Sequence, residues 1–527
     1  MRGLVSGIGA LGVAVVATAP AAGADMAAVP RVVAVVDSWT GFYAGLSISD
    51  RWTHANWNTL GFDTPGFGFA PFASDNLASL GSTAARWGGY AGLNIQRDIF
   101  VAGIEADVGS GNSSQSIIGI PGSGVGFAAF AGSDTSRTTV QTTWDASLRA
   151  RAGFLAAPNI LLYGTAGVAF QHVKETILCS GTVLPDGCFP ISLVSTAEKT
   201  LTGWTAGFGI EAAFAGNWLV RGEYRYADFG NFDNRFDLGP TNPLGTAVTT
   251  THFFTHTATL GLAYKFGLPV ATDPVPVMPV KALVKAPVKA PPVAITPSWT
   301  GFYVGASAGA RHTDAEWITQ FVNPFPALAN QGATLDSTAF RYGGYAGFDV
   351  QIQRLVVGLE ASIGQGVNAS RSAVGIPGLG GTLPPFGNAD SVTARTGWDD
   401  SVVARMGVLA APNVLVYATG GVAFQRVTVS AFCSNDFLLG ECIVATNDES
   451  VSRTLRAGTI GAGIEAMVAP NVRARFDYRY ANFGGFRHTF FPNEPLSSPT
   501  VDIGVRTQTA TFGLAYQFGP TAVVASY

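Results

Sequence analysis

A long internal repeat constrains the fold of this 527-residue chain more than any other feature of its sequence. Three landmarks of the first half return later in the same order: residues 38–45 (SWTGFYAG) at 298–305 (SWTGFYVG), 86–92 (RWGGYAG) at 341–347 (RYGGYAG), and 262–267 (LAYKFG) at 514–519 (LAYQFG). The repeated unit is about 230 residues long, far beyond the roughly 20–50 residues of a solenoid repeat. The sequence therefore predicts two tandem copies of one domain, each large enough to bury its own core.

Each copy contains eight stretches in which polar and apolar residues alternate, the pattern of a β-strand whose faces meet different surroundings. The stretches lie near 41–57, 86–97, 99–109, 142–156, 160–172, 201–214, 217–228 and 252–266 in the first copy, and near 301–317, 341–352, 354–364, 396–410, 413–426, 454–468, 471–482 and 506–518 in the second. In the seventh stretch Arg221, Glu223 and Arg225 share one face, opposite Trp218 and Tyr224. We therefore expect eight antiparallel strands per copy.

The connections between these stretches alternate in length. Tight turns fall at Arg97-Asp98, Pro158-Asn159, Gly216-Asn217, Pro412-Asn413 and Pro470-Asn471, whereas the intervening connections are long loops rich in Gly, Ser and Pro. Short periplasmic turns and long extracellular loops are typical of outer-membrane barrels. The predicted fold class is all-β, with two tandem eight-stranded antiparallel transmembrane β-barrels joined by a Pro-rich linker. A single sixteen-stranded barrel is the alternative, because sixteen is a porin strand number.

The N-terminus and the junction between the copies set the domain boundaries. Arg2, an apolar stretch and Ala22-Gly23-Ala24 predict a secretory signal peptide. The junction is rich in Pro, Lys and Ala, which predicts an extended spacer. The expected organisation is a signal peptide over 1–24, an N-terminal periplasmic segment over 25–37, barrel 1 over 38–267, a periplasmic linker over 268–297, barrel 2 over 298–519 and a C-terminal tail over 520–527.

Composition narrows the classes of partner. Charged residues make up 13% of the chain and the formal net charge is −4, which argues against nucleic-acid binding because that requires clustered Lys and Arg. The expected partner is outer-membrane lipid. In the linker, Lys281, Lys285 and Lys289 allow two readings, a solvated spacer or a contact with the anionic cell-wall layer.

The four cysteines form two similar pairs, Cys179 with Cys188 and Cys433 with Cys442, in the same loop of each copy. In an exported protein this spacing predicts one disulfide per copy. No His lies nearby at ligand spacing, so we expect no metal site, and the sequence indicates no cofactor.

Charged residues recur on one face of the predicted strands. A charge on the lipid face of a barrel costs roughly 2–4 kcal/mol at the bilayer midplane, so these side chains are expected inside. The interior of an eight-stranded barrel is just wide enough to be filled by side chains. The predicted lumenal residues are Glu105, Asp107, Asp145, Arg149, Arg151, Glu211, Arg221, Glu223, Arg225 and Lys265 in copy 1, and Glu360, Asp399, Arg405, Glu465, Arg475, Asp477 and Arg479 in copy 2. They indicate either a salt-bridge network or an ion-selective constriction.

Aromatic residues near the strand ends are expected in the interfacial girdles. These are Trp39, Phe42, Trp87, Trp218, Tyr226 and Phe266.

Two segments match catalytic or cofactor-binding motifs, but neither lies in the structural context that its motif requires. Residues 305–309 (GASAG) match a nucleophile elbow but lie within a predicted strand, where the required strand-to-helix turn is missing. Residues 7–12 (GIGALG) match a dinucleotide fingerprint but lie in the signal peptide. The six histidines show no metal pattern, although His54 and His312 occupy nearly corresponding positions with Asp50 and Asp314 nearby. We expect no enzymatic activity.

Three motifs carry a resemblance to a known family. They are WTGFYxG at the start of both copies, YRYAxFG at 224–230 (YRYADFG) and 478–484 (YRYANFG), and AYxFG at the end of both copies. Together they resemble the small outer-membrane β-barrel proteins of alphaproteobacteria, the porin-like or immunogenic outer-membrane proteins. The resemblance implies a non-enzymatic protein of the Gram-negative outer membrane, exposed at the cell surface and sometimes credited with pore activity.

The expected function is a structural or surface role with at most small-pore activity. One alternative is a sixteen-stranded general-diffusion porin that transports small solutes. Another is an adhesin that binds a partner through long loops near 61–73 and 119–131.

Overall fold

The computed structural model describes residues 39–71, 77–121, 136–179, 192–239, 245–267, 296–322, 325–326, 332–367, 369–377, 390–433, 446–494, 498–519 and 522–523. The predicted signal peptide, the N-terminal periplasmic segment and most of the linker lie outside these residues. Cys188, Cys442 and parts of the expected adhesive loops lie outside them too. The predicted disulfides therefore stay predictions, although Cys179 and Cys433 are themselves fully buried.

The first copy folds into a closed antiparallel ring of eight strands. Its strands are β1 (Gly41–Thr64), β4 (Ser82–Arg97), β5 (Phe100–Ile118), β6 (Arg137–Ala157), β7 (Ile160–Cys179), β8 (Leu193–Phe214), β9 (Trp218–Asp237) and β10 (Thr246–Lys265). Each strand pairs with the next around the ring, and β10 pairs with β1 to close it.

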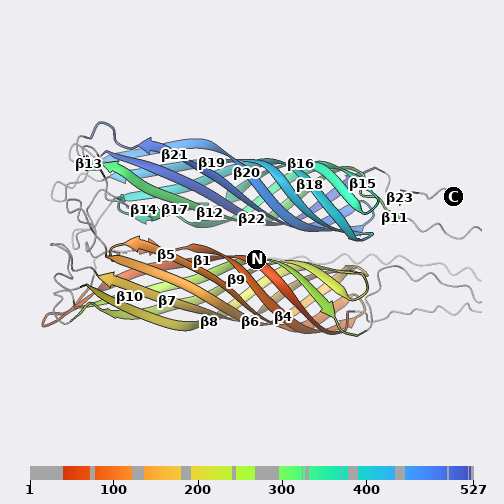
Figure 1. Cartoon of the computed structure of the whole chain (residues 1–527), viewed down its shortest axis with the longest axis horizontal. Coiled ribbons are helices and arrows are strands. Elements are labelled where there is room, and N and C mark those ends of the chain that lie inside the picture. Colours follow the sequence, from red (N-terminus) through yellow and green to blue (C-terminus); the bar gives the residue numbers. More distant parts are fainter. Residues whose placement is uncertain are drawn as a thin grey trace, which may run out of the picture.

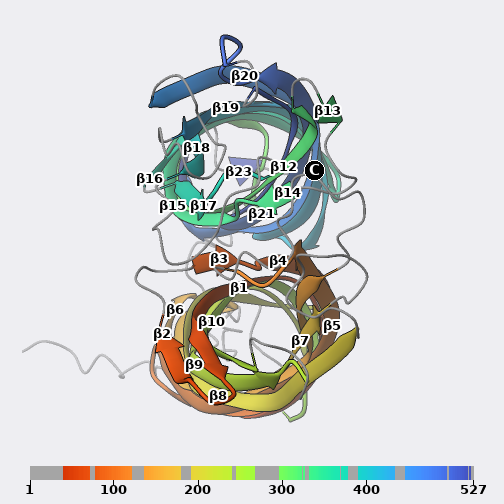
Figure 2. The same ribbon diagram turned by 90° about the vertical axis from the view of Figure 1, so that its left-hand side faces the viewer.

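The second copy forms an equivalent ring, visible beside the first in Figure 2. Its strands are β12 (Gly301–Val322), β15 (Ser337–Ile352), β16 (Leu355–Val367), β18 (Ser391–Ala411), β19 (Val414–Cys433), β20 (Asn447–Ala469), β21 (Val472–Thr489) and β22 (Pro499–Phe518). Here β22 pairs with β12 to close the ring. The predicted fold of two tandem eight-stranded barrels is confirmed, and the single sixteen-stranded barrel is wrong because each ring closes on itself.

Seven short strands complete the described chain. Toward the long loops, β2 (Gly68–Pro71) and β3 (Leu77–Ser79) pair with β1, β13 (Phe325–Pro326) and β14 (Gly332–Thr334) pair with β12, and β17 (Ser370–Val374) pairs with β18. The other two, β11 (Thr296–Pro297) and β23 (Ala522–Val523), pair with each other, so residues next to the two ends of barrel 2 are tied together. None of the described residues forms a helix long and apolar enough to cross a membrane.

The ring strands run past the stretches expected from sequence. The strand β1 has 24 residues and β7 has 20, where the alternation predicted 41–57 and 160–172. A barrel strand needs about 9–11 residues to cross a bilayer, so the remainder extends the sheet toward the long loops. The alternation weakens there because threonines occupy both faces, as at Thr249, Thr250 and Thr251 of β10.

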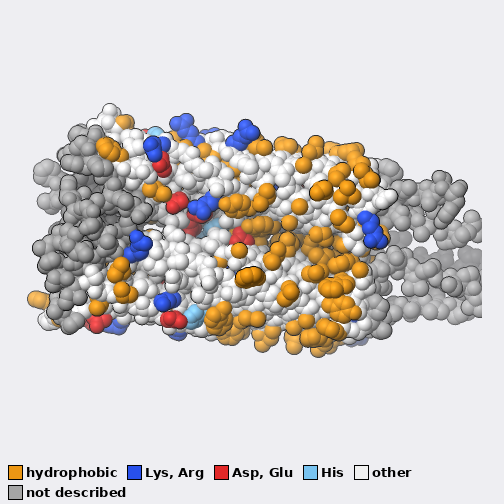
Figure 3. Space-filling view, viewed as in Figure 1, with side chains coloured by type: hydrophobic (Ala, Val, Ile, Leu, Met, Phe, Trp, Pro, Cys, Tyr) orange, Lys and Arg blue, Asp and Glu red, His pale blue; other side chains and the backbone are white. Residues whose placement is uncertain are grey.

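Large apolar side chains point outward along the half of each barrel nearer the short turns. Leu46 is 75% exposed, Trp87 73% and Ile460 67%. Figure 3 shows exposed apolar side chains of one face as a broad orange belt, with most charged groups of that face toward the opposite end of the barrels. Such a belt is the surface that a barrel presents to lipid.

The two barrels lie side by side, with the strand ends that lead into the long loops at the same end of both (Figure 1), and equivalent positions of the two copies meet where they touch. We call this contact the seam. At the short-turn end, Asn159 and Asn413 occupy the same turn of each copy and donate hydrogen bonds to each other's side-chain oxygen, at 2.9 and 2.8 Å. Further along, Trp52 of β1 stacks on His312, its counterpart in β12, with ring centroids 5.3 Å apart. Such pairing of equivalent positions indicates a two-fold, isologous arrangement.

Apart from this asparagine pair, the half of the seam nearer the short turns is apolar. One cluster joins Ile160, Ile210 and Ala212 of barrel 1 to Val414, Ile464, Ala466 and Phe476 of barrel 2. Phe476 packs directly on Gly222, the equivalent position of β9, so closely that a Cβ on Gly222 would overlap the phenyl ring. The ring of one copy therefore fills a space that the other copy leaves empty.

The half nearer the long loops is polar. Asp50 accepts hydrogen bonds from Tyr478 Oη at 2.6 Å and from Trp52 Nε1 at 2.8 Å. Arg371 donates to Asn56 across the seam at 2.7 Å. Asp50 lies two residues from Ile48 in the same strand, so it also points outward, where lipid could offer it no hydrogen bond. Barrel 2 supplies the hydrogen-bond donor instead.

Asp336 is an unusual group in this polar half. It lies between β14 and β15, is 3% exposed and contacts Gly81, its counterpart in barrel 1. Neither carboxylate oxygen finds a hydrogen-bond donor among the described residues. Burial, reinforced by the charge of Asp314, raises the pKa of Asp336 well above its usual range.

We expect Asp336→Asn to stabilise the docked barrels above the usual carboxyl pKa of about 3.9. A raised pKa means that docking favours the neutral acid, so the ionised form weakens docking increasingly as pH rises. The free energy of unfolding of Asp336→Asn should exceed that of wild type by up to about 1.4 kcal/mol for each unit by which the pKa of Asp336 is raised. The difference should vanish near pH 4. Thermal unfolding at pH 4 and pH 8 measures it, with the exposed Asp233→Asn as control. A lower midpoint for Asp336→Asn than for wild type at pH 8 would contradict the assignment.

Candidate functional site

The inward faces of the strands carry most of the buried charge. Because successive residues of a strand point to opposite sides, the alternation in β9 places Arg221, Glu223 and Arg225 in the lumen, where they are 2%, 2% and 8% exposed. The barrel encloses these groups away from water, so each must find an opposite charge or a hydrogen bond.

Arg149 of β6 is the centre of the network in barrel 1. Its guanidinium lies 2.5 Å from Glu105, 2.7 Å from Glu223 and 3.4 Å from Asp107, contacting carboxylates from two other strands. It also donates to Thr165 at 3.1 Å. One arginine therefore ties four strands together across the lumen.

Further pairs lie on both sides of this centre. Toward the short turns, Arg221 contacts Glu105 at 2.5 Å and Arg151 contacts Glu211 at 3.3 Å. Toward the long loops, Arg225 contacts Asp107 at 2.7 Å, and Asp145 receives Arg51 at 2.5 Å and Arg86 at 2.7 Å. Acids and bases thus alternate along the lumen.

Barrel 2 has a comparable network with different members. Arg475 and Arg479 contact Glu360 at 2.5 and 2.6 Å, and Arg479 also contacts Asp477 at 2.7 Å. Arg405 pairs with Glu465, while Asp399 pairs with both Arg311 and Arg341.

At two places the two lumens differ by an acid and a base together. Barrel 1 has Asp107 and Arg149 where barrel 2 has Ser362 and Val403, so an acid and its base are lost together. Conversely, Asp349 and Arg473 form a 2.6 Å pair in barrel 2 where barrel 1 has Asn94 and Leu219. Replacing an acid and a base together keeps the charges of the lumen balanced, whereas losing one alone would leave the remaining buried charges with one counter-charge too few.

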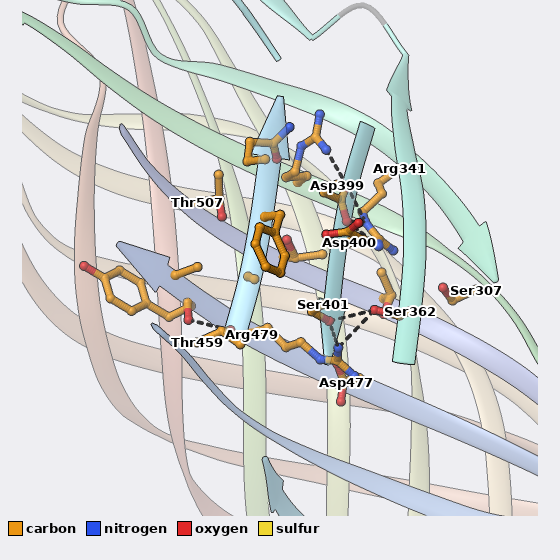
Figure 4. Close-up of a pocket in the computed structure, with 18 of the residues that line it drawn as sticks. Ser307, Arg341, Ser362, Asp399, Asp400, Ser401, Thr459, Asp477, Arg479 and Thr507 are labelled. Carbon is orange, nitrogen blue, oxygen red and sulfur yellow. Dashed lines mark hydrogen bonds and ion pairs between the residues drawn. The ribbon is translucent and has the colours of Figure 1, made fainter. Parts of the chain in front are cut away.

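A small cavity remains at the outer end of the barrel 2 network (Figure 4). Arg341 lies beside Asp399, and Arg479 reaches Ser401 at 2.9 Å and Ser362 at 3.3 Å. The polar lining belongs to the network described above, and its arginines are all engaged with acids or hydroxyls.

Aromatic side chains close each lumen at the short-turn end. Trp39 is fully buried and donates from Nε1 to the carbonyl of Pro158 at 3.0 Å, while its backbone N–H donates to Gln96 at 2.9 Å. Trp299 makes the same contacts with Pro412 and Gln351 in barrel 2, at 3.0 and 2.9 Å. The expectation that Trp39 belongs to an interfacial girdle is wrong, because the chain turns it inward before β1 begins.

The long-loop end of each lumen is filled by an apolar cluster. In barrel 1, Trp57 stacks on Phe236 with ring centroids 5.7 Å apart, above Val173 and Ile177. In barrel 2, Trp317 stacks on Phe490 at 5.1 Å. Each lumen therefore has a tryptophan at one end, an ion-pair network in the middle and an apolar core at the other end.

Within the described residues, no three His, Cys, Asp or Glu side chains are arranged to hold a metal ion.

Comparison with known proteins shows the family to which the two barrels belong. The profile of the outer membrane protein beta-barrel domain family matches residues 8–266 and again residues 282–518. The chain belongs to this family. It contains two domains of the family, and it is a protein of the Gram-negative outer membrane.

Named relatives agree with this assignment. The chain is 31% identical over 241 residues to a 31 kDa outer-membrane immunogenic protein of Brucella melitensis, covering 44% of this chain and 84% of that protein. It is 31% identical over 237 residues to a 25 kDa outer-membrane immunogenic protein of Brucella abortus, covering 45% and 84%. A 22 kDa outer membrane protein of Rhizobium leguminosarum is 31% identical over 180 residues, covering 33% and 68%.

The predicted lumenal residues of these family barrels lie inside the rings, and all but one are in the ion pairs above. The exception is Lys265, which is fully buried near the short turns and donates to the carbonyl of Thr40 at 3.3 Å. Sequence reasoning missed Arg51, Arg86, Arg311 and Arg341, although each lies in a predicted strand or at its first residue.

Lumenal tyrosines were missed as well. Tyr43 donates to Glu105 at 2.8 Å and Tyr163 to Glu223 at 2.9 Å, and Tyr303 and Tyr417 do the same in barrel 2. The available signal was their recurrence on the inward face at equivalent positions of both copies.

The nucleophile-elbow match at 305–309 lies inside β12, so the strand-to-helix turn that an elbow requires does not form. His54 and His312, which belong to different barrels, lie together. Both point outward into the seam, where their rings are 5.3 Å apart.

Proposed function

We propose that this protein is a sealed, non-enzymatic pair of outer-membrane barrels with a structural and surface role rather than a solute channel. The observation that carries the proposal is the filling of each lumen by Trp39 or Trp299, the ion-pair network and the apolar outer cluster. An ion would have to break several buried pairs to pass, each of which costs several kcal/mol to leave unpaired, of order 3–5.

The extended strands favour a role outside the membrane. Beyond the apolar belt the sheets continue toward the long loops and carry exposed ion pairs, such as Arg235 with Asp63 and Arg487 with Asp502. Side chains of this kind suit an aqueous surface. Membrane lipid is the proposed partner of the belt, while a cell-wall contact through the lysines of the linker stays an expectation.

Planar-bilayer recording of the purified full-length protein tests the sealed state. We expect no conductance steps, or steps far smaller than those of a general porin recorded in the same membranes. Trp39→Ala should also be silent, because the ion-pair network and the outer cluster still block the lumen. Stable porin-sized steps from wild-type protein would overturn the proposal.

A further inference from the structure

The six histidines of the chain fall into two groups with opposite surroundings. His172, His252 and His488 are partly exposed, and each lies beside a carboxylate: Glu198 at 2.9 Å, Asp228 at 3.2 Å and Glu449 at 2.9 Å. The other three, His54, His256 and His312, meet at the seam, and within the described residues none of them pairs with a carboxylate.

The three seam histidines come from both barrels. His54 of β1 has its ring centroid 5.6 Å from that of His256 of β10 and 5.3 Å from that of His312 of β12. His54 is 4% exposed and His312 1%, while His256 is partly buried. Docking of the barrels therefore places three titratable rings together in a site shielded from water.

Their hydrogen-bond partners are hydroxyls. Thr338 Oγ1 lies 2.8 Å from His54 Nε2 and 2.9 Å from His312 Nδ1, so one hydroxyl lies between two rings from different barrels. Tyr224 Oη lies 2.6 Å from His256 Nδ1. A hydroxyl carries one proton, so Thr338 can donate to one neutral ring while it accepts from the other.

The charged and titratable groups around the three histidines do not neutralise the positive charge that protonation would give these rings. On the surrounding elements these are Asp50, Tyr224, Tyr226, Tyr478, Arg371, Asp314 and Asp336. Asp50 is engaged by Trp52 and Tyr478, and Arg371 adds a positive charge on the same side. Asp314 and Asp336 make no ion pair with any of the three rings.

From this geometry we propose that the seam is a pH-dependent docking interface, whose polar half separates when the three histidines are protonated. A free imidazole takes up a proton near pH 6.5. Below that pH, docking would hold the charges of His256 and His312 within 6 Å of that of His54 in a buried site, and both rings at Thr338 would become donors.

The direction of the pH dependence follows from which state of the barrels, docked or separated, binds more protons. The separated barrels expose the imidazoles to water and bind the protons, so the three histidines weaken docking as pH falls below about 6.5; Asp336 acts in the opposite direction, because its ionisation weakens docking as pH rises. Each imidazole that must lose a proton to dock weakens docking roughly tenfold per pH unit. Among the described residues, the apolar cluster of the seam contains no group that titrates in this range, so separation begins at the long-loop end. The proposal does not depend on whether the lumens conduct.

Spin labels on the full-length protein test this in lipid vesicles. The two labels go at Arg235→Cys of barrel 1 and Arg487→Cys of barrel 2, whose side chains are 60% and 64% exposed. Double electron–electron resonance should give one narrow distance distribution at pH 8, and a broader one with longer distances at pH 5, reversible on return to pH 8.

Two matched triple variants identify the residues responsible. His54→Gln, His256→Gln and His312→Gln together should keep the narrow distribution at both pH values. His172→Gln, His252→Gln and His488→Gln together should respond as wild type does. An unchanged wild-type distribution from pH 8 to pH 5 would overturn the proposal without any variant, and so would a wild-type response in the seam variant.

Discussion

Arg149→Leu should lower the free energy of unfolding of barrel 1 by about 3–5 kcal/mol, the usual cost of removing one partner of a buried ion pair. The arginine is fully buried and contacts Glu105, Asp107 and Glu223. Leucine would fill much of the space but leave several carboxylates in the lumen with fewer counter-charges. Heat-modifiable gel mobility and urea titration in detergent measure the loss.

The control is Arg235→Leu, which removes an exposed arginine from its pair with Asp63. Exposed pairs contribute at most about 1 kcal/mol, so this variant should unfold with the wild type. The stronger test adds Asp107→Ser and replaces Arg149 with valine, which copies the residues of barrel 2 at these positions. If that double variant were less stable than Arg149→Val alone, the paired-charge account of the lumen would be wrong.

Gly222→Phe should separate the two barrels. The glycine lies against the ring of Phe476 with no room for a Cβ, so a second ring there would overlap it. Overpacking of this kind costs about 1–3 kcal/mol or more, against an interface that is otherwise apolar at this level. With a protease site inserted in the predicted linker, the cut halves of wild-type protein should copurify in mild detergent, and those of Gly222→Phe should not.

The decisive comparison is the exchange of both residues. Gly222→Phe combined with Phe476→Gly moves the ring to the other barrel and the empty space with it, so the cut halves should copurify again. Ala102→Phe, an exposed position of the lipid-facing belt outside the seam, is the control and should leave the halves together. Failure of the exchange to rescue association would show that another feature governs the contact.

Much of the lumen could be predicted from the sequence because a strand obeys a period of two. Once Arg221, Glu223 and Arg225 are placed on one face, the cost of a charge in lipid fixes that face as the interior. The same logic failed for Trp39, since it precedes β1 and no periodicity governs its direction. Strand ends were underestimated where threonines occupy both faces and remove the contrast between them.

The seam could not be predicted in the same way. Asp50, His54, His256 and His312 are polar residues on outward faces, which for a lone barrel is an anomaly at or just beyond the belt. These outward-facing polar residues were the signal in the sequence that could have indicated a contact surface. Their explanation needs the second barrel, and neither composition nor spacing says which strands of two separate rings will touch.

The meeting of equivalent positions at the seam has a consequence for how such a protein can change. In a dimer of identical chains, a residue on the axis faces its own copy, so a phenylalanine there must accommodate a phenylalanine. Covalent fusion of the copies removes that requirement, and each site on the axis can then hold two different residues. Gly222 with Phe476, Gly81 with Asp336 and Trp52 with His312 are three such sites. Fusion in this protein thus permits contacts that self-association of one barrel could not produce.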